Sequence, residues 1–276
     1  MKLRTLLTTL LVALCSLGAT AQTTYSQALA HYFEAHGSID QVKGNMQNML
    51  TAINQQIVSN EGEIPAGYTP ESLAKKYIDT QFNKDYVSIF VPYFAETMPV
   101  SDIAKVADAL DTPQTRTANK HMEVFSSPDL ETEIESFATR AAQDLLNGKK
   151  PKKVKANASP ARVKLFMTYY KESGLDELMD SAIDMYAKID PTFDNDSEDF
   201  QKLMAGLKQY AHDNYPAIFL NFCGDSVTDE DLRAMTKVSA MPEYKRFIGL
   251  IKEIMGDPQS LGMALLTKYQ EWMQKQ

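Results

Sequence analysis

The sequence repeats itself, and this internal repeat restricts the fold more than any other feature of the chain. When the chain is shifted by 129 residues, residues 86–125 align with residues 215–254 without a gap. Apolar residues and prolines recur in the same order at the aligned positions. The matched pairs include Tyr86 with Tyr215, Ile89 with Ile218, Phe90 with Phe219, Tyr93 with Phe222, Glu96 with Asp225, Asp102 with Asp231, Ile103 with Leu232 and Pro113 with Pro242. The sequence therefore predicts a duplication of one module.

The repeat continues toward the N-terminus at a slightly larger offset. A longer loop in the first copy, residues 60–67, accounts for the change of offset. At a shift of 136 to 137 residues, the matched positions are Tyr32-Phe33 with Tyr169-Tyr170, Gly37 with Gly174 and Asp40 with Asp176. We therefore expect helical repeat 1 at residues 22–147, a lysine-rich linker at 148–160 and helical repeat 2 at 161–276.

Each predicted copy has the apolar periodicity of α-helices. In residues 39–57, apolar side chains recur three and four positions apart, which places them on one face of a helix. Residues 175–189 show a similar spacing. The alternating pattern that is typical of β-strands is missing from the sequence. We therefore expect an all-α fold in which the helices pack as an antiparallel, bundle-like arrangement.

Residues that end or begin helices occupy matching places in the two copies. Gly37 and Gly174 stand where a preceding helix would end with a residue in the left-handed conformation. The Thr-Asp-Glu-Asp sequence at residues 228–231 resembles a capping box at a helix start. Pro113 and Pro242 are each expected at the first position of a further helix.

The N-terminal residues have the pattern of a secretory signal peptide. A basic start is followed by a short apolar stretch and then by the small residues Ala19 and Ala21. The apolar stretch is shorter than the roughly 20 residues that a membrane-spanning helix needs. We expect residues 1–21 to be removed after Ala21, which makes the mature protein periplasmic or extracellular. Lipoprotein processing at Cys15 is not favoured, because the preceding Leu14 is not small.

The charge of the expected mature chain is strongly negative, with one basic exception. The whole chain has 28 basic and 36 acidic residues, and removal of residues 1–21 leaves 26 basic against 36 acidic ones. An acidic surface argues against nucleic acid as a partner. Five lysines fall within seven residues at 149–155. A solvated linker is the expected interpretation, and contact with an anionic membrane surface is the weaker alternative.

No set of residues has the spacing of a metal site. His31 and His36 are five positions apart, so a helix would turn them to different faces. Residues 190–199 resemble an EF-hand loop but lack its central glycine and its last glutamate. We interpret this stretch as an acidic loop that caps a helix from Phe200. The histidines of the chain are His31, His36, His121 and His212. We expect no metal and no cofactor.

Catalytic motifs are also missing from the sequence. It contains no G-x-S-x-G nucleophile elbow and no glycine-rich phosphate loop. Cys223 lies in an apolar run and is expected to be a buried, inert thiol. No residue is assigned a catalytic or cofactor-binding role. A protein without catalytic activity is the preferred interpretation, and an enzyme of unrecognised class stays the alternative.

The order of these features resembles that of a bacterial envelope family, domain of unknown function 2059. The shared pattern is an aromatic pair, a glycine turn, a long Met-rich helix, an acidic helix start and a final helix that begins with proline. The likeness is clearest at residues 227–232 and 241–247. The first copy keeps Ile103 and Pro113 but has Pro99 in place of the threonine. The resemblance covers about 90 residues of each copy. It implies an exported helical domain and brings no catalytic residues.

Together these features predict a non-catalytic binding or interaction module of the bacterial cell envelope. Met-rich helical faces suit adaptable grooves, so an envelope protein, a peptide or an apolar small molecule is the expected partner. The last helices of the copies differ, because residues 244–254 are more apolar than the aligned residues 115–125. We therefore expect residues 160–276 to fold alone, and residues 22–147 to be less stable or to depend on the other half. The last helix of the first copy is expected to take cover from residues 130–146, from the second copy or from a partner.

Overall fold

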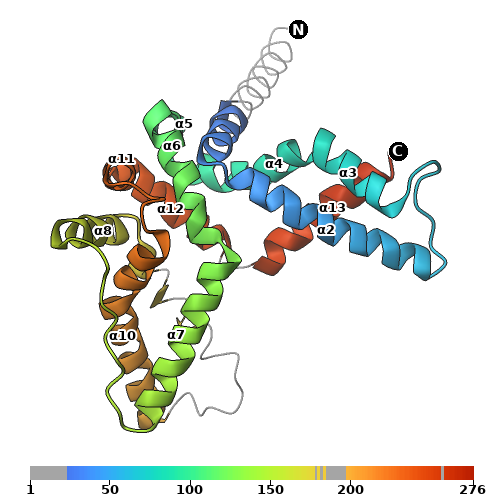
Figure 1. Ribbon diagram of the computed structural model, residues 1–276. Coiled ribbons are helices and arrows are strands. Elements are labelled where there is room, and N and C mark those ends of the chain that lie inside the picture. The colour runs from blue at the N-terminus through green and yellow to red at the C-terminus, as the bar shows by residue number, and fades with distance from the viewer. Residues whose placement is uncertain (1–23, 178, 181–182, 185–196, 256–257) are drawn as a thin grey trace, which may run out of the picture. The chain divides into compact units, whose positions relative to one another are not determined.

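The computed structural model is helical throughout its described part (Figure 1). The residues that it describes are 24–177, 179–180, 183–184, 197–255 and 258–276. These residues contain no strand, so the all-α prediction is confirmed. Within the same residues, no helix combines the length and the apolar character that crossing a membrane requires. The expected signal peptide lies outside the described residues.

Most of the described helices are joined by short connections, and longer segments join α2 to α3 and α7 to α8. Residues 24–36 are helical and lead into the first labelled helix. In chain order the labelled elements are α2 (Ser38–Ser59), α3 (Pro70–Thr80), α4 (Phe82–Thr97), α5 (Val100–Leu110), α6 (Pro113–Met122), the 3-10 helix η1 (Glu123–Ser126), α7 (Pro128–Leu146), α8 (Pro160–Glu172), α10 (Glu198–Cys223), α11 (Asp229–Ser239), α12 (Pro242–Met255) and α13 (Pro258–Met273).

Most of the predicted helix boundaries are confirmed. Gly37 and Gly174 have φ angles of 75° and 71°, in the left-handed region where glycine is favoured. Thr228 forms the predicted capping box, and the N–H of Asp231 donates to its hydroxyl oxygen at 3.1 Å. Pro113 and Pro242 begin α6 and α12, where the missing proline N–H costs no helical hydrogen bond.

The start of α10 differs from the prediction. The helix begins at Glu198 and not at Phe200, and the hydroxyl of Ser197 accepts a hydrogen bond from the N–H of Phe200 at 3.2 Å. Serine is a strong N-cap, because its oxygen satisfies one of the unpaired amides of the first turn. The acidic residues Glu198 and Asp199 therefore lie inside the first turn of α10. Their negative charges interact favourably there with the positive end of the helix dipole. Residues 185–196 lie outside the described residues.

The chain forms two compact units, and neither unit coincides with one of the predicted repeats. The first unit contains the residues up to Thr112 together with Pro242–Gln276, and the second contains Pro113–Met241. The chain thus enters the second unit at Pro113 and returns to the first unit at Pro242. The two units do not have the boundaries of the predicted repeats, 22–147 and 161–276.

In the first unit, the last two helices of the chain complete the core. The α12 residue Phe247 is fully buried, with its ring centroid 3.9 Å from that of Tyr32 and 4.7 Å from that of Phe94. The α13 residue Tyr269 is also buried, and its hydroxyl donates to Asn54 Oδ1 at 2.9 Å. Helices α12 and α13 both pack against α4, and α12 also packs against α5.

In the second unit, α6 and α7 cover helices from later in the chain. Helix α6 packs on α11, and α7 packs on α10 and runs beside it in Figure 1. The ring of Phe137 on α7 stacks on Tyr210 of α10 with 4.9 Å between centroids. Phe125, in the short helix after α6, meets Phe219 at 4.8 Å. The face that α6 buries carries Thr115, Ala118 and Met122.

This arrangement changes the expectation for fragments. The thin apolar face of α6 is covered by α11, which agrees with the predicted need for cover from the second copy. Residues 160–276, however, lack α6 and α7 and contain α12 and α13, whose partners lie before Thr112. The expectation that this fragment folds alone does not match the division into units, because the fragment omits α6 and α7 of the second unit and carries α12 and α13 of the first.

Candidate functional site

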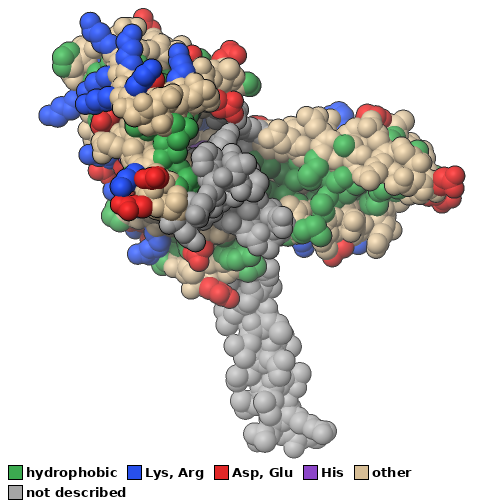
Figure 2. All heavy atoms as spheres, turned by 90° about the horizontal axis from the view of Figure 1, so that it is seen from below, with side chains coloured by type: hydrophobic (Ala, Val, Ile, Leu, Met, Phe, Trp, Pro, Cys, Tyr) green, Lys and Arg blue, Asp and Glu red, His purple; other side chains and the backbone are tan. Residues whose placement is uncertain are grey.

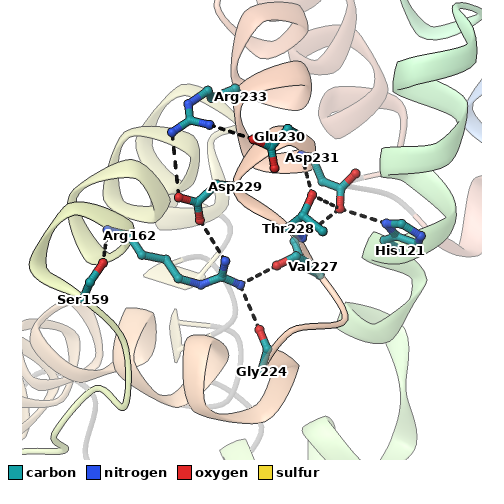
Figure 3. Close-up of polar contacts among 10 residues, drawn as sticks. All are labelled: His121, Ser159, Arg162, Gly224, Val227, Thr228, Asp229, Glu230, Asp231 and Arg233. Atoms are coloured by element: carbon teal, nitrogen blue, oxygen red, sulfur yellow. Dashed lines mark hydrogen bonds and ion pairs between the residues drawn. The ribbon is translucent and has the colours of Figure 1, made fainter.

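A polar cluster surrounds the start of α11 in the second unit (Figure 3). The carboxylate of Asp231 accepts hydrogen bonds at 2.8 Å from the N–H and from the hydroxyl of Thr228. His121, on α6, meets the same carboxylate oxygen through Nδ1 at 2.8 Å. An ionised carboxylate only accepts, so Nδ1 carries the shared proton. Burial raises the pKa of Asp231, but the hydrogen bonds from His121 and Thr228 outweigh it and lower the pKa below its ordinary value.

An arginine forms the second part of this cluster. Arg162, at the start of α8, donates to Asp229 Oδ1 at 2.8 Å and to the carbonyl oxygen of Gly224 at 2.8 Å. It also donates to the carbonyl oxygen of Val227. Figure 3 shows the guanidinium lying between α8 and the loop that precedes α11. Arg162 therefore satisfies backbone acceptors at the end of α10 and ties α8 to that loop.

The cluster has one feature of a hydrolase site and lacks the others. A histidine oriented by a buried aspartate is the supporting half of a catalytic triad. Within the described residues, no hydroxyl or thiol is hydrogen-bonded to Nε2 of His121, which is where a nucleophile would lie. Cys223, as predicted, is buried, and its burial raises the pKa of the thiol to about 12. The contacts of His121 and Arg162 are those of residues that hold helices together.

The other histidines have partners that do not belong to this cluster. His31 pairs with Asp111 at 3.1 Å in the first unit, and His212 pairs with Asp180 at 2.9 Å in the second. The ring of His36 stacks on that of Tyr32, and burial of His36 lowers the pKa of its imidazole. Within the described part of the chain, no three His, Cys, Asp or Glu residues are grouped as metal ligands would be. These residues therefore show no common site.

The lysine-rich linker is bound to α10, which the sequence did not predict. The side chain of Asn214 accepts from the N–H of Val154 at 2.7 Å. The side chain of Asn221 accepts from the N–H of Asn157 at 2.6 Å and donates to the carbonyl oxygen of Lys155 at 2.9 Å. In Figure 1 the linker follows α10 from the end of α7 to the start of α8. The sequence predicted a solvated linker and gave no indication of these backbone contacts.

The lysines of this linker remain exposed. Burial alternates along the segment, with Val154, Ala156 and Ala158 partly buried and the residues between them exposed. We call the five exposed lysines the lysine strip: Lys149, Lys150, Lys152, Lys153 and Lys155. Among the described residues, none of the five forms a salt bridge. Figure 2 shows the molecule from below the view of Figure 1, and many Lys and Arg side chains gather on one side of the face in view.

A hollow in the first unit is a weaker candidate. It has a volume of about 420 Å³ and lies where α2, α3 and α4 meet. The residues that line it are Lys43, Ile78, Asp79, Thr80, Gln81, Asn83 and Lys84. Asp79 already pairs with Lys75 at 2.8 Å. Its lining is mixed in charge and shows no convergence on one ligand type.

Comparison of the chain with protein-family models, with curated proteins and with solved structures gives no match.

Proposed function

We propose that this chain is an exported, non-catalytic binding module of the bacterial cell envelope, and that it binds through the lysine strip. The observation that carries the proposal is the fixed position of the linker: its backbone is hydrogen-bonded to α10 while its lysines stay exposed. Exposed charge without partners on an otherwise acidic protein is a feature of a contact surface. The signal-peptide pattern and the resemblance to the envelope family support the location.

The polar cluster around α11 supports the non-catalytic part of this proposal. Asp231 accepts hydrogen bonds from Thr228 in the capping box and from His121. Arg162 donates to Asp229 and to backbone carbonyl oxygens. Each of these groups has a structural partner at hydrogen-bond distance. An enzyme of unrecognised class remains the second candidate, and the His121–Asp231 pair is the observation in its favour.

We further propose that the chain arose by duplication and that the two copies exchange their last two helices. The boundaries of the compact units fall before Pro113 and before Pro242, positions that the 129-residue repeat aligns. Helix α6 of the first copy packs on α11 of the second, whereas α12 of the second packs on α5 of the first. The pairing is therefore reciprocal, and each unit would be a small bundle with helices from both copies.

Two aligned aspartates support the exchange. Asp102, near the start of α5, forms an ion pair with Arg246 of α12 at 3.6 Å. Asp231, its aligned residue in α11, pairs with His121 of α6 at 2.8 Å. In both units the aspartate of one copy thus meets a basic side chain on a helix from the other copy.

Fractionation of cells that export the protein tests the proposed function. We expect wild-type protein to sediment with the envelope, and a triple variant with Lys152→Gln, Lys153→Gln and Lys155→Gln to move to the soluble fraction. The intact mass of the exported protein should correspond to an N-terminus at Gln22.

A matched control carries the same loss of three charges at exposed lysines elsewhere, Lys75→Gln, Lys84→Gln and Lys202→Gln. This control should sediment as the wild type does. Equal sedimentation of all three proteins would contradict the lysine strip as the binding surface.

A further inference from the structure

We propose that the partner of the lysine strip is the surface of an anionic lipid bilayer. This inference rests on the proposed function, because it names the partner of the same surface. The ligand chemistry is that of anionic lipid headgroups, which the lysines contact from outside the bilayer without insertion of a helix.

The lysine strip is held in position before it binds. Three hydrogen bonds from Asn214 and Asn221 fix the backbone at Val154, Lys155 and Asn157. The hydroxyl of Tyr210 donates to the carbonyl oxygen of Lys152, which fixes a further point. A flexible linker would lose backbone entropy on binding to a surface, whereas this segment has already lost it on folding.

The shape and chemistry of the lysine strip also suit a bilayer surface. Its seven residues, 149–155, would span about 20 Å if fully extended. All of its basic residues are lysines, which are compact, hydrated charges on flexible stems. Such charges suit a diffuse anionic surface, whereas recognition of a single carboxylate or phosphate favours the planar fork of arginine. A row of lysines without a pocket therefore fits a bilayer surface better than a discrete acidic ligand.

The charges of the chain are unevenly distributed along the sequence. Outside the strip, residues 22–276 contain 21 basic and 36 acidic residues. An anionic bilayer therefore repels most of the protein surface. Approach to the bilayer is favourable only when the lysine strip faces it. Attraction to anionic lipids decays within a Debye length, so lysines that project from the surface contribute most.

Sedimentation with lipid vesicles tests this inference on the purified mature chain. Vesicles of 30% phosphatidylglycerol in phosphatidylcholine are compared with vesicles of phosphatidylcholine alone. We expect binding to the anionic vesicles only, and loss of that binding in 0.5 M salt. Each lysine contributes roughly fivefold to the partition coefficient, so the triple variant at Lys152, Lys153 and Lys155 should bind roughly 100-fold more weakly.

The control variant at Lys75, Lys84 and Lys202 should bind as the wild type does, and circular dichroism verifies that both variants fold. Absence of binding to anionic vesicles overturns the inference, as does an equal loss in the control. Tighter binding to a soluble polyanion such as polyphosphate, at equal phosphate concentration, also overturns it. If sedimentation with the cell envelope still depends on the strip, the proposed function survives and only the lipid partner is rejected.

Discussion

Pro113 and Pro242 lie 129 positions apart, which is the offset of the sequence repeat, and each is the first residue after the chain passes from one compact unit into the other. Pro113 begins α6, which packs on α11, and Pro242 begins α12, which packs on α5. Proline at the first helical position fixes φ and needs no intrahelical acceptor. The passage between the units therefore occurs at the same place in both aligned segments.

Removal of one ring from α12 should destabilise the first unit. Phe247 is fully buried between Tyr32 and Phe94, so Phe247→Ala leaves a large cavity. We expect a loss of about 3–5 kcal/mol in the free energy of unfolding, measured by urea titration. The control is Tyr93→Ala, at a side chain that is 50% exposed, and it should change stability by less than about 0.5 kcal/mol. A similar loss in both variants would show that Phe247 is not a core residue.

The Asp231 carboxylate should stabilise the second unit in a pH-dependent way. Its pKa is lower in the folded chain than in the unfolded one, so its stabilisation is complete above about pH 4 and is lost as the pH falls through the folded value. Asp231→Asn should therefore cost about 1–2 kcal/mol at pH 7, from urea titration. The difference from wild type should shrink toward pH 3.

Glu230→Gln is a control in the same helical turn, at a side chain that is 73% exposed. It should have little effect at either pH, because surface ion pairs contribute little. A constant difference between wild type and Asp231→Asn from pH 7 to pH 3 would contradict the assigned role of the carboxylate.

The helices and their caps could be predicted from the sequence because they depend on neighbouring residues. Thr228 and Asp231 are three positions apart, and a proline marks the start of both α6 and α12. The buried face of α2 was visible in the spacing of Ile39, Met46 and Leu50.

The choice of partner for the last helices could not be predicted in this way. If α5 and α11 are copies of one helix, their apolar faces are alike, so α6 and α12 can each pack on either of them. The binding of the linker to α10 could not be predicted for a different reason. Asn214 and Asn221 contact backbone atoms 60 and 64 positions away, through side chain to backbone hydrogen bonds that leave no periodic pattern. The only available signal was the position of polar asparagines within the apolar end of α10.

The thiol of Cys223 should be unreactive in the folded protein. Burial raises its pKa to about 12, and the nearby Arg162 lowers it by less. Because iodoacetamide reacts with the thiolate, labelling at pH 8 should be at least about 100-fold slower in the native protein than in 8 M urea. Mass spectrometry of timed samples measures both rates. Complete labelling of the native protein within minutes would show that the thiol is accessible.

Asn221 should keep the linker on α10. Its side chain forms two hydrogen bonds with the linker backbone, at Lys155 and Asn157. Asn221→Ala should increase trypsin cleavage within residues 149–155 by roughly 30-fold, because two hydrogen bonds of about 1 kcal/mol each no longer oppose opening. Gln209→Ala, which removes a contact with Asp213 of the same helix, is the control. Equal cleavage of the two variants would mean that the linker is held by other contacts.

Each compact unit is proposed to contain helices from both copies, and cleavage between the proposed copies tests this arrangement most directly. A protease site inserted between Gly148 and Lys149 produces two fragments, each carrying helices of both units. Size-exclusion chromatography of the cleaved protein in increasing urea follows their separation, while circular dichroism follows helix content. We predict one particle of uncut size that separates only at the urea concentration where helicity is lost. Separation into two folded halves at lower urea would contradict the exchange.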